Sequence, residues 1–350
     1  MSELALIVDG TRHLGWKEIQ IRRSLDAMAD SFELVLSEKW AERDGSITEP
    51  RRLRTGAPVV VEIDGEPVIT GHIDDVLPSY DARSHSLVVS GRSKTADLVD
   101  SSSTAQPWAT GQTVLQVARR VAEPFGIEVI AEVDVGAPLR ALEVEPGQTY
   151  GEALIQIASY RALLLVADEQ GRLVITRPPR ATLKTELALG ENIRVARGRF
   201  SDRDRFGEVI VQGQGAADDT WFGAPASGAS GRAKDDGIKR HRPTLVLCDT
   251  STDSSSCSQR AEWEVRRRWG QSRGITYTVA GWRHQDGLWR PGDLVPIRDK
   301  WMFDEPVEWL ITEVQLLLDE RGERAEIRVA PQSSYDIEAA PEPERESDVW

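Results

Sequence analysis

The chain has 350 residues, of which 40% are hydrophobic and 29% are charged, and its formal net charge is −14. This composition is typical of a folded protein with more than one domain and excludes a wholly disordered chain. The negative charge argues against a general nucleic-acid binder, because phosphate affinity needs clustered Lys and Arg. It is compatible with nucleic acid that moves past the protein without being held.

Neither a membrane segment nor a signal peptide is indicated. The longest apolar run, residues 162–167, has the length of a strand and is too short to cross a bilayer. Residues 1–13 do not combine a basic flank with an apolar stretch. The two cysteines, Cys248 and Cys257, favour synthesis in a reducing compartment, with a disulfide between them as the minority alternative.

The first hundred residues are predicted to be β-structure, because short alternating or apolar runs are separated by turn residues. Asp64-Gly65 lies between two of these runs and is typical of a tight hairpin. The strands expected here are residues 4–8, 19–22, 32–36, 59–63, 68–70, 72–76 and 86–89. Short antiparallel strands in this order indicate a small barrel.

From about residue 101 the spacing of apolar residues becomes helical. One helix is predicted over residues 114–125 and ends at a glycine. Thr149, followed three positions later by Glu152, forms a capping box and predicts the start of a second helix. A hairpin is expected within residues 162–176. These elements predict a small α/β domain.

The second half alternates between β-structure and other patterns. Strands are expected from about residue 193, including residues 208–212, and again at residues 244–247 and 276–279. Residues 215–243 are crowded with Gly, Ala, Asp and Ser, which predicts a mobile loop without a core. A helix is expected over residues 256–271. The tail at 339–349, rich in Pro and Glu, is predicted to be unstructured without a partner, with Trp350 as a candidate anchor.

Two distant stretches resemble each other. Each reads as a glycine turn, a strand, a hairpin, a strand containing Ile-Thr, a second hairpin and a strand. The paired segments are residues 54–59 with 290–295, 69–70 with 311–312, and 86–89 with 326–329. The order of four elements predicts two similar barrels, and duplicated barrels suit a ring in which a trimer presents six of them.

The expected fold class is therefore mixed β and α+β, with two similar small antiparallel β-barrels and two small α/β domains in a homotrimeric ring. The expected domains are a first barrel at 1–100, an α/β domain at 101–178, a second barrel at 179–214 and 275–335, an inserted loop and α/β element at 215–274, and an acidic flexible tail at 336–350.

A phosphate-binding loop is the first chemical hypothesis, because Gly91, Lys94 and Thr95 stand between a strand and a helix-prone stretch. The motif needs a glycine directly before the lysine, and Ser93 occupies that place. The strand also belongs to a hairpin rather than a βαβ unit. We interpret the stretch as a domain junction. A second glycine pair, in Gly213-Gln214-Gly215, lacks the third glycine of a dinucleotide site.

Other candidate chemistry is equally weak. The histidines His13, His72, His85, His241 and His284 are scattered, and with Cys248 and Cys257 they lack the spacing of a zinc site. Asp74 with Glu313 is a nominal glycosidase pair that nothing in the sequence singles out. Arg266-Arg267-Arg268 beside Trp269 favours a salt-bridged helix face over a basic patch. No catalytic, cofactor-binding or metal-binding residue is assigned, so we expect neither an enzyme nor a cofactor.

The tryptophans are concentrated near the end of the chain. Of eleven in total, six fall in one stretch: Trp263, Trp269, Trp282, Trp289, Trp301 and Trp309. A Trp-rich core and a surface for permanent partners both explain this concentration.

Several stretches together resemble baseplate hub proteins of Mu-like contractile-tailed phages. They are residues 89–100 (VSGRSKTADLVD), 71–80 (GHIDDVLPSY), 124–127, 163–165, 277–283 and 288–289. The resemblance runs from about residue 4 to 335 and leaves out the 215–243 loop and the tail.

The resemblance implies a homotrimeric hub that joins a sixfold tail tube to a threefold central spike, with an axial channel through which DNA passes. The implied partners are the spike, the tail tube, the baseplate wedges and, as a further candidate, the tape-measure protein, with no insertion into membranes. The implied location is the virion tail baseplate, assembled in the bacterial cytoplasm. The net charge suggests an acidic channel lining. A tail-associated cell-wall hydrolase and a carbohydrate-binding tail protein are the alternatives.

Overall fold

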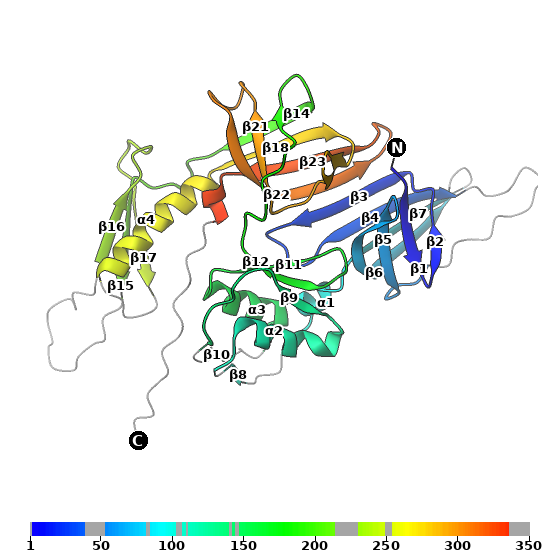
Figure 1. Cartoon of the computed structure of the whole chain (residues 1–350), viewed down its shortest axis with the longest axis horizontal. Coiled ribbons are helices and arrows are strands. Elements are labelled where there is room, and N and C mark those ends of the chain that lie inside the picture. The colour runs from blue at the N-terminus through cyan, green and yellow to red at the C-terminus, as the bar shows by residue number, and fades with distance from the viewer. Residues whose placement is uncertain are drawn as a thin grey trace, which may run out of the picture.

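The computed structural model describes residues 2–38, 53–81, 85–102, 107–109, 111–139, 142–143, 147–213, 230–248 and 254–335. The expected flexible tail and Trp350 lie outside these residues. Figure 1 shows a large sheet, an α/β domain on one side of it, and a smaller three-stranded sheet with a long helix beside it. No helix among the described residues is long and apolar enough to cross a membrane.

One sheet of thirteen strands forms the body of the protein. Eleven of its strands follow one another in this order across the sheet: β14 (Ile193–Phe200), β18 (Arg273–Ala280), β23 (Arg324–Ala330), β22 (Val307–Leu318), β3 (Glu18–Ser24), β4 (Ser31–Glu38), β7 (His85–Ser93), β6 (Glu66–Tyr80), β5 (Pro58–Ile63), β1 (Leu4–Val8) and β2 (Thr11–His13). β21 (Leu294–Arg298) also pairs with β22 and carries β13 (Leu187–Ala188) on its other side.

The prediction of two closed barrels is wrong for the described residues. β22, from the second half of the chain, pairs antiparallel with β3 from the first half, with Leu316 opposite Ile21. β3 and β4 therefore join the two halves into one continuous sheet, and neither half closes on itself. The two halves of the sheet also share one hydrophobic cluster, which includes Leu34 of the first half and Ile327 of the second.

The duplication is present, but with a different offset from the one expected. Gly56 donates its backbone N–H to Ile73, and Ile73 donates to Ala57; Gly292 donates to Ile311, and Ile311 donates to Asp293. Both β6 and β22 then have a register shift directly after that isoleucine. We call β5–β7 the first β unit and β21–β23 the second β unit.

These hydrogen bonds show which residues of the two β units are equivalent. At two places they differ from the pairing of segments that the sequence suggested. Ile311 corresponds to Ile73 rather than Ile69, and Val329 pairs with Ile311 as Gly91 pairs with Ile73. The glycine turns were matched correctly. Low identity between the two copies left the offset undetermined, because a strand pattern repeats every two residues.

The α/β domain packs two main helices against a three-stranded sheet. Its elements are α1 (Ala96–Asp100), β8 (Pro107–Ala109), α2 (Val114–Ala122), η1 (Glu123–Phe125), β9 (Val129–Ala131), β10 (Leu142–Glu143), α3 (Tyr150–Ser159), β11 (Leu164–Ala167) and β12 (Leu173–Thr176). The capping box of Thr149 and Glu152 is confirmed, with both hydrogen bonds present, and so is the hairpin of β11 and β12.

The region between residues 208 and 271 forms a second small α/β element. β15 (Glu208–Gly213) pairs with β16 (Ser230–Lys234) and β17 (Pro243–Cys248), and α4 (Ser254–Gln271) packs on them. Two expectations are wrong here: β15 belongs to this sheet rather than to the second β unit, and β16 lies inside the predicted loop. A short hairpin, β19 (Arg283–His284) and β20 (Gly287–Leu288), and the turn η2 (Gln332–Tyr335) complete the described elements.

Candidate functional site

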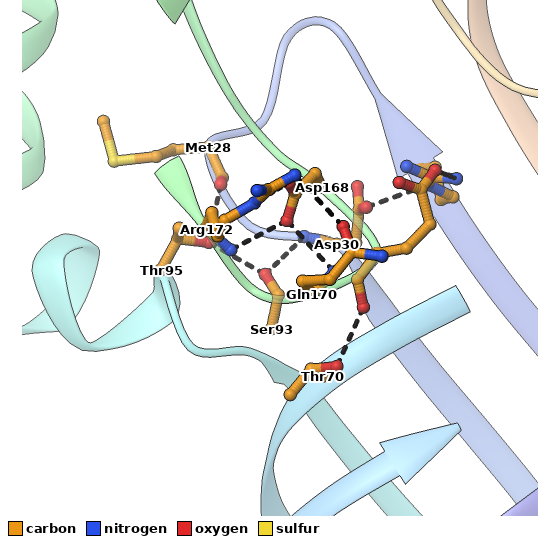
Figure 2. A network of polar contacts seen from close by, with 10 residues as sticks. Met28, Asp30, Thr70, Ser93, Thr95, Asp168, Gln170 and Arg172 are labelled. Carbon is orange, nitrogen blue, oxygen red and sulfur yellow. Dashed lines mark hydrogen bonds and ion pairs between the residues drawn. The ribbon is translucent and has the colours of Figure 1, made fainter. Parts of the chain in front are cut away.

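The stretch that resembled a phosphate loop forms a set of buried hydrogen bonds where the first β unit meets the α/β domain (Figure 2). Ser93 Oγ accepts from the backbone N–H of Asp30 at 3.1 Å, and the backbone N–H of Ser93 donates to the Asp30 carbonyl at 2.9 Å. The hydroxyls of Ser93 and Thr95 lie 2.8 Å apart, and Thr95 donates to the carbonyl of Met28. These groups are already bonded within the protein and are not available to a phosphate.

Arg23 lies at the centre of this region and was not singled out from the sequence. Its Nε is 3.0 Å from Asp30 Oδ2, and its Nη1 is 2.8 Å from Glu169 Oε1 in the turn between β11 and β12. Arg23 and Asp30 are both buried. We call Arg23, Asp30, Ser93, Thr95 and Glu169 the polar junction.

The two carboxyl groups around Arg23 have pKa values shifted in opposite directions. Burial raises the pKa of Asp30 to about 6, although the Arg23 guanidinium lowers it. Burial is the largest single influence on Glu169 and would raise its pKa, but the charge and hydrogen bond of Arg23, a backbone hydrogen bond and the charge of Arg290 together hold this pKa below its usual range. The difference follows from exposure, since the Asp30 side chain is 4% exposed and the Glu169 side chain is 31% exposed.

The turn that carries Glu169 is held against β6 at close distance. Thr70 Oγ1 donates to the Glu169 carbonyl at 2.8 Å, and the backbone N–H of Lys94 donates to the Thr70 carbonyl at 3.1 Å. Gly171 has a φ of 74°, and a Cβ there would lie 2.5 Å from the Thr70 oxygen. Only glycine fits both conditions. The polar junction therefore fixes the α/β domain to the first β unit.

The nominal glycosidase pair is separated across the sheet. Asp74 on β6 and Glu313 on β22 are four strand spacings apart, which is roughly 19 Å. Glycosidase carboxyl groups lie at most about 9.5 Å apart. Asp74 is 2.7 Å from Arg92, and Glu313 is 2.8 Å from Arg22. Burial would raise the pKa of Glu313, but the hydrogen bonds from Arg22 and Gln315 hold it below its usual range.

The described residues bring no metal-binding cluster of His, Cys, Asp and Glu together. Cys257 is buried on α4, while the side chain of Cys248 lies outside the described residues, so the disulfide alternative is not tested. Gln214 and Gly215 of the second glycine motif also lie outside them.

The arginine run on α4 forms the salt-bridged face that its pattern predicted. Arg268 and Arg260 both lie about 3 Å from Glu264, and Arg260 and Arg267 lie over the ring of Trp263. Most of the clustered tryptophans belong to the interior: the buried ones are Trp263, Trp282, Trp289 and Trp309. Trp301 differs, since it is 86% exposed.

Family models match three parts of the chain. Residues 3–93 match the N-terminal domain of Mu phage baseplate assembly protein GpP-like proteins. Residues 95–177 match the second domain of baseplate hub protein gp44-like proteins, and residues 252–338 match the fourth domain of Mu phage baseplate assembly protein GpP.

A curated relative covers nearly the whole chain. The baseplate hub protein gp44 of Escherichia phage Mu is 30% identical over 345 residues, which span 95% of this chain and 88% of that protein. The chain belongs to the Mu gp44-like baseplate hub family. It is a structural component of a phage tail baseplate and hence of the virion.

Solved structures agree with this assignment. The hub is similar to the 43 kDa tail protein of prophage MuSo2 from Shewanella oneidensis, with 36% identity, a TM-score of 0.85, and coverage of 96% of this chain and 100% of that one. It is also similar to a tail protein from Neisseria meningitidis MC58, with 25% identity, a TM-score of 0.78, and coverage of 97% and 99%.

Proposed function

We propose that the protein is a non-enzymatic, trimeric hub that joins the sixfold tail tube to the threefold central spike and surrounds an axial channel for DNA. The observation that carries this proposal is the duplication: the first and second β units repeat the same backbone hydrogen bonds within one sheet. Three chains would present six such units around an axis, so one ring would match threefold and sixfold neighbours together.

Two strand edges support closure into a ring. β14 lies at one end of the sheet, and among the described residues its only neighbour besides β18 is an isolated bridge from Ile193 to Leu189. Towards the other end of the sheet, β5 stops pairing with β6 at His72, so within the described part of the chain residues 75–80 of β6 pair only with β7. An unpaired edge is a template for another chain. Because the two edges differ, their pairing between copies is head-to-tail and can close a ring.

The polar face of the sheet is the candidate channel lining. A water-filled channel requires polar side chains, and this face carries charged residues of both signs. Carboxylates predominate on β3, β4 and β6, where Arg92 lies among them, and arginines predominate on β14 and β23, where Glu313 and Glu326 lie beside them. The carboxylates are Glu18, Glu33, Asp74 and Asp75, and the arginines are Arg197, Arg199 and Arg328. The face is therefore not the uniformly acidic lining that the net charge suggested.

The partners that follow from this role are the central spike, the tail tube, the baseplate wedges and the tape-measure protein, with assembly in the bacterial cytoplasm. The competing hypothesis of a hydrolase is not supported by its nominal carboxylate pair, because Asp74 and Glu313 are too far apart to act on one substrate. A carbohydrate-binding role would require several exposed tryptophans on one surface, and four of the six clustered ones are buried.

The mass of the particle in solution tests the proposal. Light scattering on the purified protein should give three times the chain mass of 38.9 kDa, and negative-stain images should show an axial hole. Leu77→Asp on β6 and Phe200→Asp on β14 should each yield monomers. Ile155→Asp on α3 is a matched control, because Ile155 is 54% exposed and Phe200 is 53% exposed. A wild-type monomer, or a trimer that tolerates both edge variants, would contradict the proposal.

A further inference from the structure

A groove of about 740 Å³ lies on the polar face of the sheet, between β14, β18, β23, β22, β3 and the last turn of α4. We call it the basic groove. Its charged lining residues are Arg22, Arg197, Arg199, Arg268, Arg328, Asp204, Glu313 and Glu326. Five arginines against three carboxylates make it positive in a chain whose net charge is −14.

The arginines of the groove fall into two groups. Arg22 is paired with Glu313 at 2.8 Å, and Arg268 with Glu264 at 3.0 Å. Within the part of the chain that the structure describes, the guanidinium groups of Arg197, Arg199 and Arg328 have neither an ion pair nor a hydrogen bond, and all three are exposed. Arginine side chains that are gathered in a concavity without partners are available to an anion.

We propose that the basic groove contacts the phosphate groups of duplex DNA as the DNA moves through the hub. This inference rests on the proposed function, which places the polar face of the sheet on the channel. A guanidinium group is planar and offers a fork of N–H donors that matches two phosphate oxygens. Contacts of this kind bind the backbone and carry no sequence preference.

The arrangement of the free arginines fits a phosphate backbone. Arg197 and Arg199 are two residues apart on one face of β14, a separation of about 6.6 Å, which is close to the rise of two phosphates of one DNA strand along the helix axis, at about 3.4 Å each. Arg197 is opposite Thr276, and Thr276 is opposite Arg328, so a row of polar side chains crosses three strands. Arg328 extends over Gly274 of β18, and its Nε would be 3.9 Å from a Cβ there.

A carboxylate of a neighbouring copy is the competing partner for these arginines. In the proposed ring, β14 of one copy lies beside β6 of the next, and β6 carries Asp74 and Asp75. Asp74 is already paired with Arg92, and Asp75 accepts a hydrogen bond from Ser90. These carboxylates are thus partly satisfied within their own chain, which favours DNA. The three carboxylates of the groove weaken each contact between an arginine and a phosphate, so that DNA can move on after binding.

The salt dependence of DNA binding tests the inference. Fluorescence anisotropy of a labelled duplex is measured with the intact oligomer between about 50 and 200 mM salt. The groove variant combines Arg197→Ala, Arg199→Ala and Arg328→Ala. The matched control combines Arg194→Ala, Arg240→Ala and Arg321→Ala, which removes three exposed arginines outside the groove. The slope of log K against log salt should fall by about 2.7 in the groove variant, at about 0.9 per lost phosphate contact, and by less than about 1 in the control.

Several other outcomes would overturn the assignment of the groove to DNA. Absence of wild-type binding at the lowest salt, or equal losses in both variants, would show that the groove is not a DNA contact. A groove variant that becomes monomeric would assign the arginines to a neighbouring copy. Displacement of the duplex by inorganic phosphate at constant ionic strength would assign the groove to a small anion. A wild-type protein that is monomeric but binds DNA through these arginines would contradict the proposed trimer and would still support the assignment of the groove to DNA.

Discussion

In the first β unit, β7 carries Gly91 and Ser90 at the positions where β23 of the second β unit carries Val329 and Arg328. The backbone bonds around both sites are the same. Phe32 of β4 fills the space beside Gly91, since a Cβ there would lie 2.6 Å from its ring, whereas Val329 is itself fully buried. The two units thus keep a common backbone while different side chains fill the core and the polar face.

The exits from the two units differ as well. After β7 the chain enters the polar junction and the α/β domain through buried Ser93 and Thr95. After β23 it makes the short turn η2, where Tyr335 donates a hydrogen bond to Asp26 at 2.7 Å. Only the first exit has a buried ion pair among the described residues. A rigid link to a second domain therefore depends on polar groups specific to one copy of the repeat.

The largest effect is expected from Arg23→Met, which breaks the polar junction of the first unit. Removing one partner leaves Asp30 buried without its counter-charge, and this loss costs about 3–5 kcal/mol. Arg22→Met is the control on the same strand: Arg22 is an exposed partner of Glu313, and such a pair contributes at most about 1 kcal/mol. Urea unfolding of both variants measures the difference.

Two outcomes would contradict this comparison. Equal destabilisation by the two variants would mean that burial of Arg23 adds nothing to its ion pairs. An Arg23→Met protein as stable as wild type would mean that Asp30 becomes protonated without cost.

The sequence contains enough information for local structure and part of the junction. The capping box of Thr149 and the Asp64-Gly65 hairpin depend on neighbours in the chain, and both are found where expected. Arg23 follows Ile19 and Ile21 at intervals of two residues, so the alternation of this strand predicts that its side chain points to the buried face. Its partner Glu169 could not be predicted, because 146 residues separate them.

The pairing of β22 with β3 could not be predicted for the same reason. Both strands alternate in a way that fits an edge or a central position equally well, and the choice depends on how the two halves share one core. The basic groove likewise gathers residues from five strands and a helix, so no sequence motif marks it.

A smaller effect is expected from Gly91→Ala, which tests the difference between Gly91 and Val329. A Cβ at Gly91 would lie 2.2 Å from the His72 carbonyl oxygen, so the strands must move apart, at about 1–3 kcal/mol. Gly274→Ala is the control in the same sheet, because the nearest atom to its Cβ would be 3.9 Å away. Thermal unfolding should separate the variants by several degrees. Similar melting temperatures would show that the close approach of β6 and β7 is not needed.

The smallest effect is expected in the pH dependence of the two carboxyl groups around Arg23. Because the pKa of Glu169 is lowered in the folded protein, its contribution is present above its unfolded pKa and is lost as the pH falls through the folded value. The stability gap between wild type and Glu169→Gln should therefore narrow, by on the order of 1 kcal/mol, as the pH is lowered from 6 to 3.

The contribution of Asp30 to stability should change with pH in the opposite direction. Its pKa is raised to about 6, so its contribution is present below the unfolded pKa and is lost as the pH rises through about 6. Relative to Asp30→Asn, the wild type should lose stability as the pH rises from about 4 to 7. Urea unfolding of both variants from about pH 3 to 7 measures the two trends. If they have the same sign, Arg23 does not hold the two carboxyl groups in different environments, and the polar junction is an ordinary surface cluster.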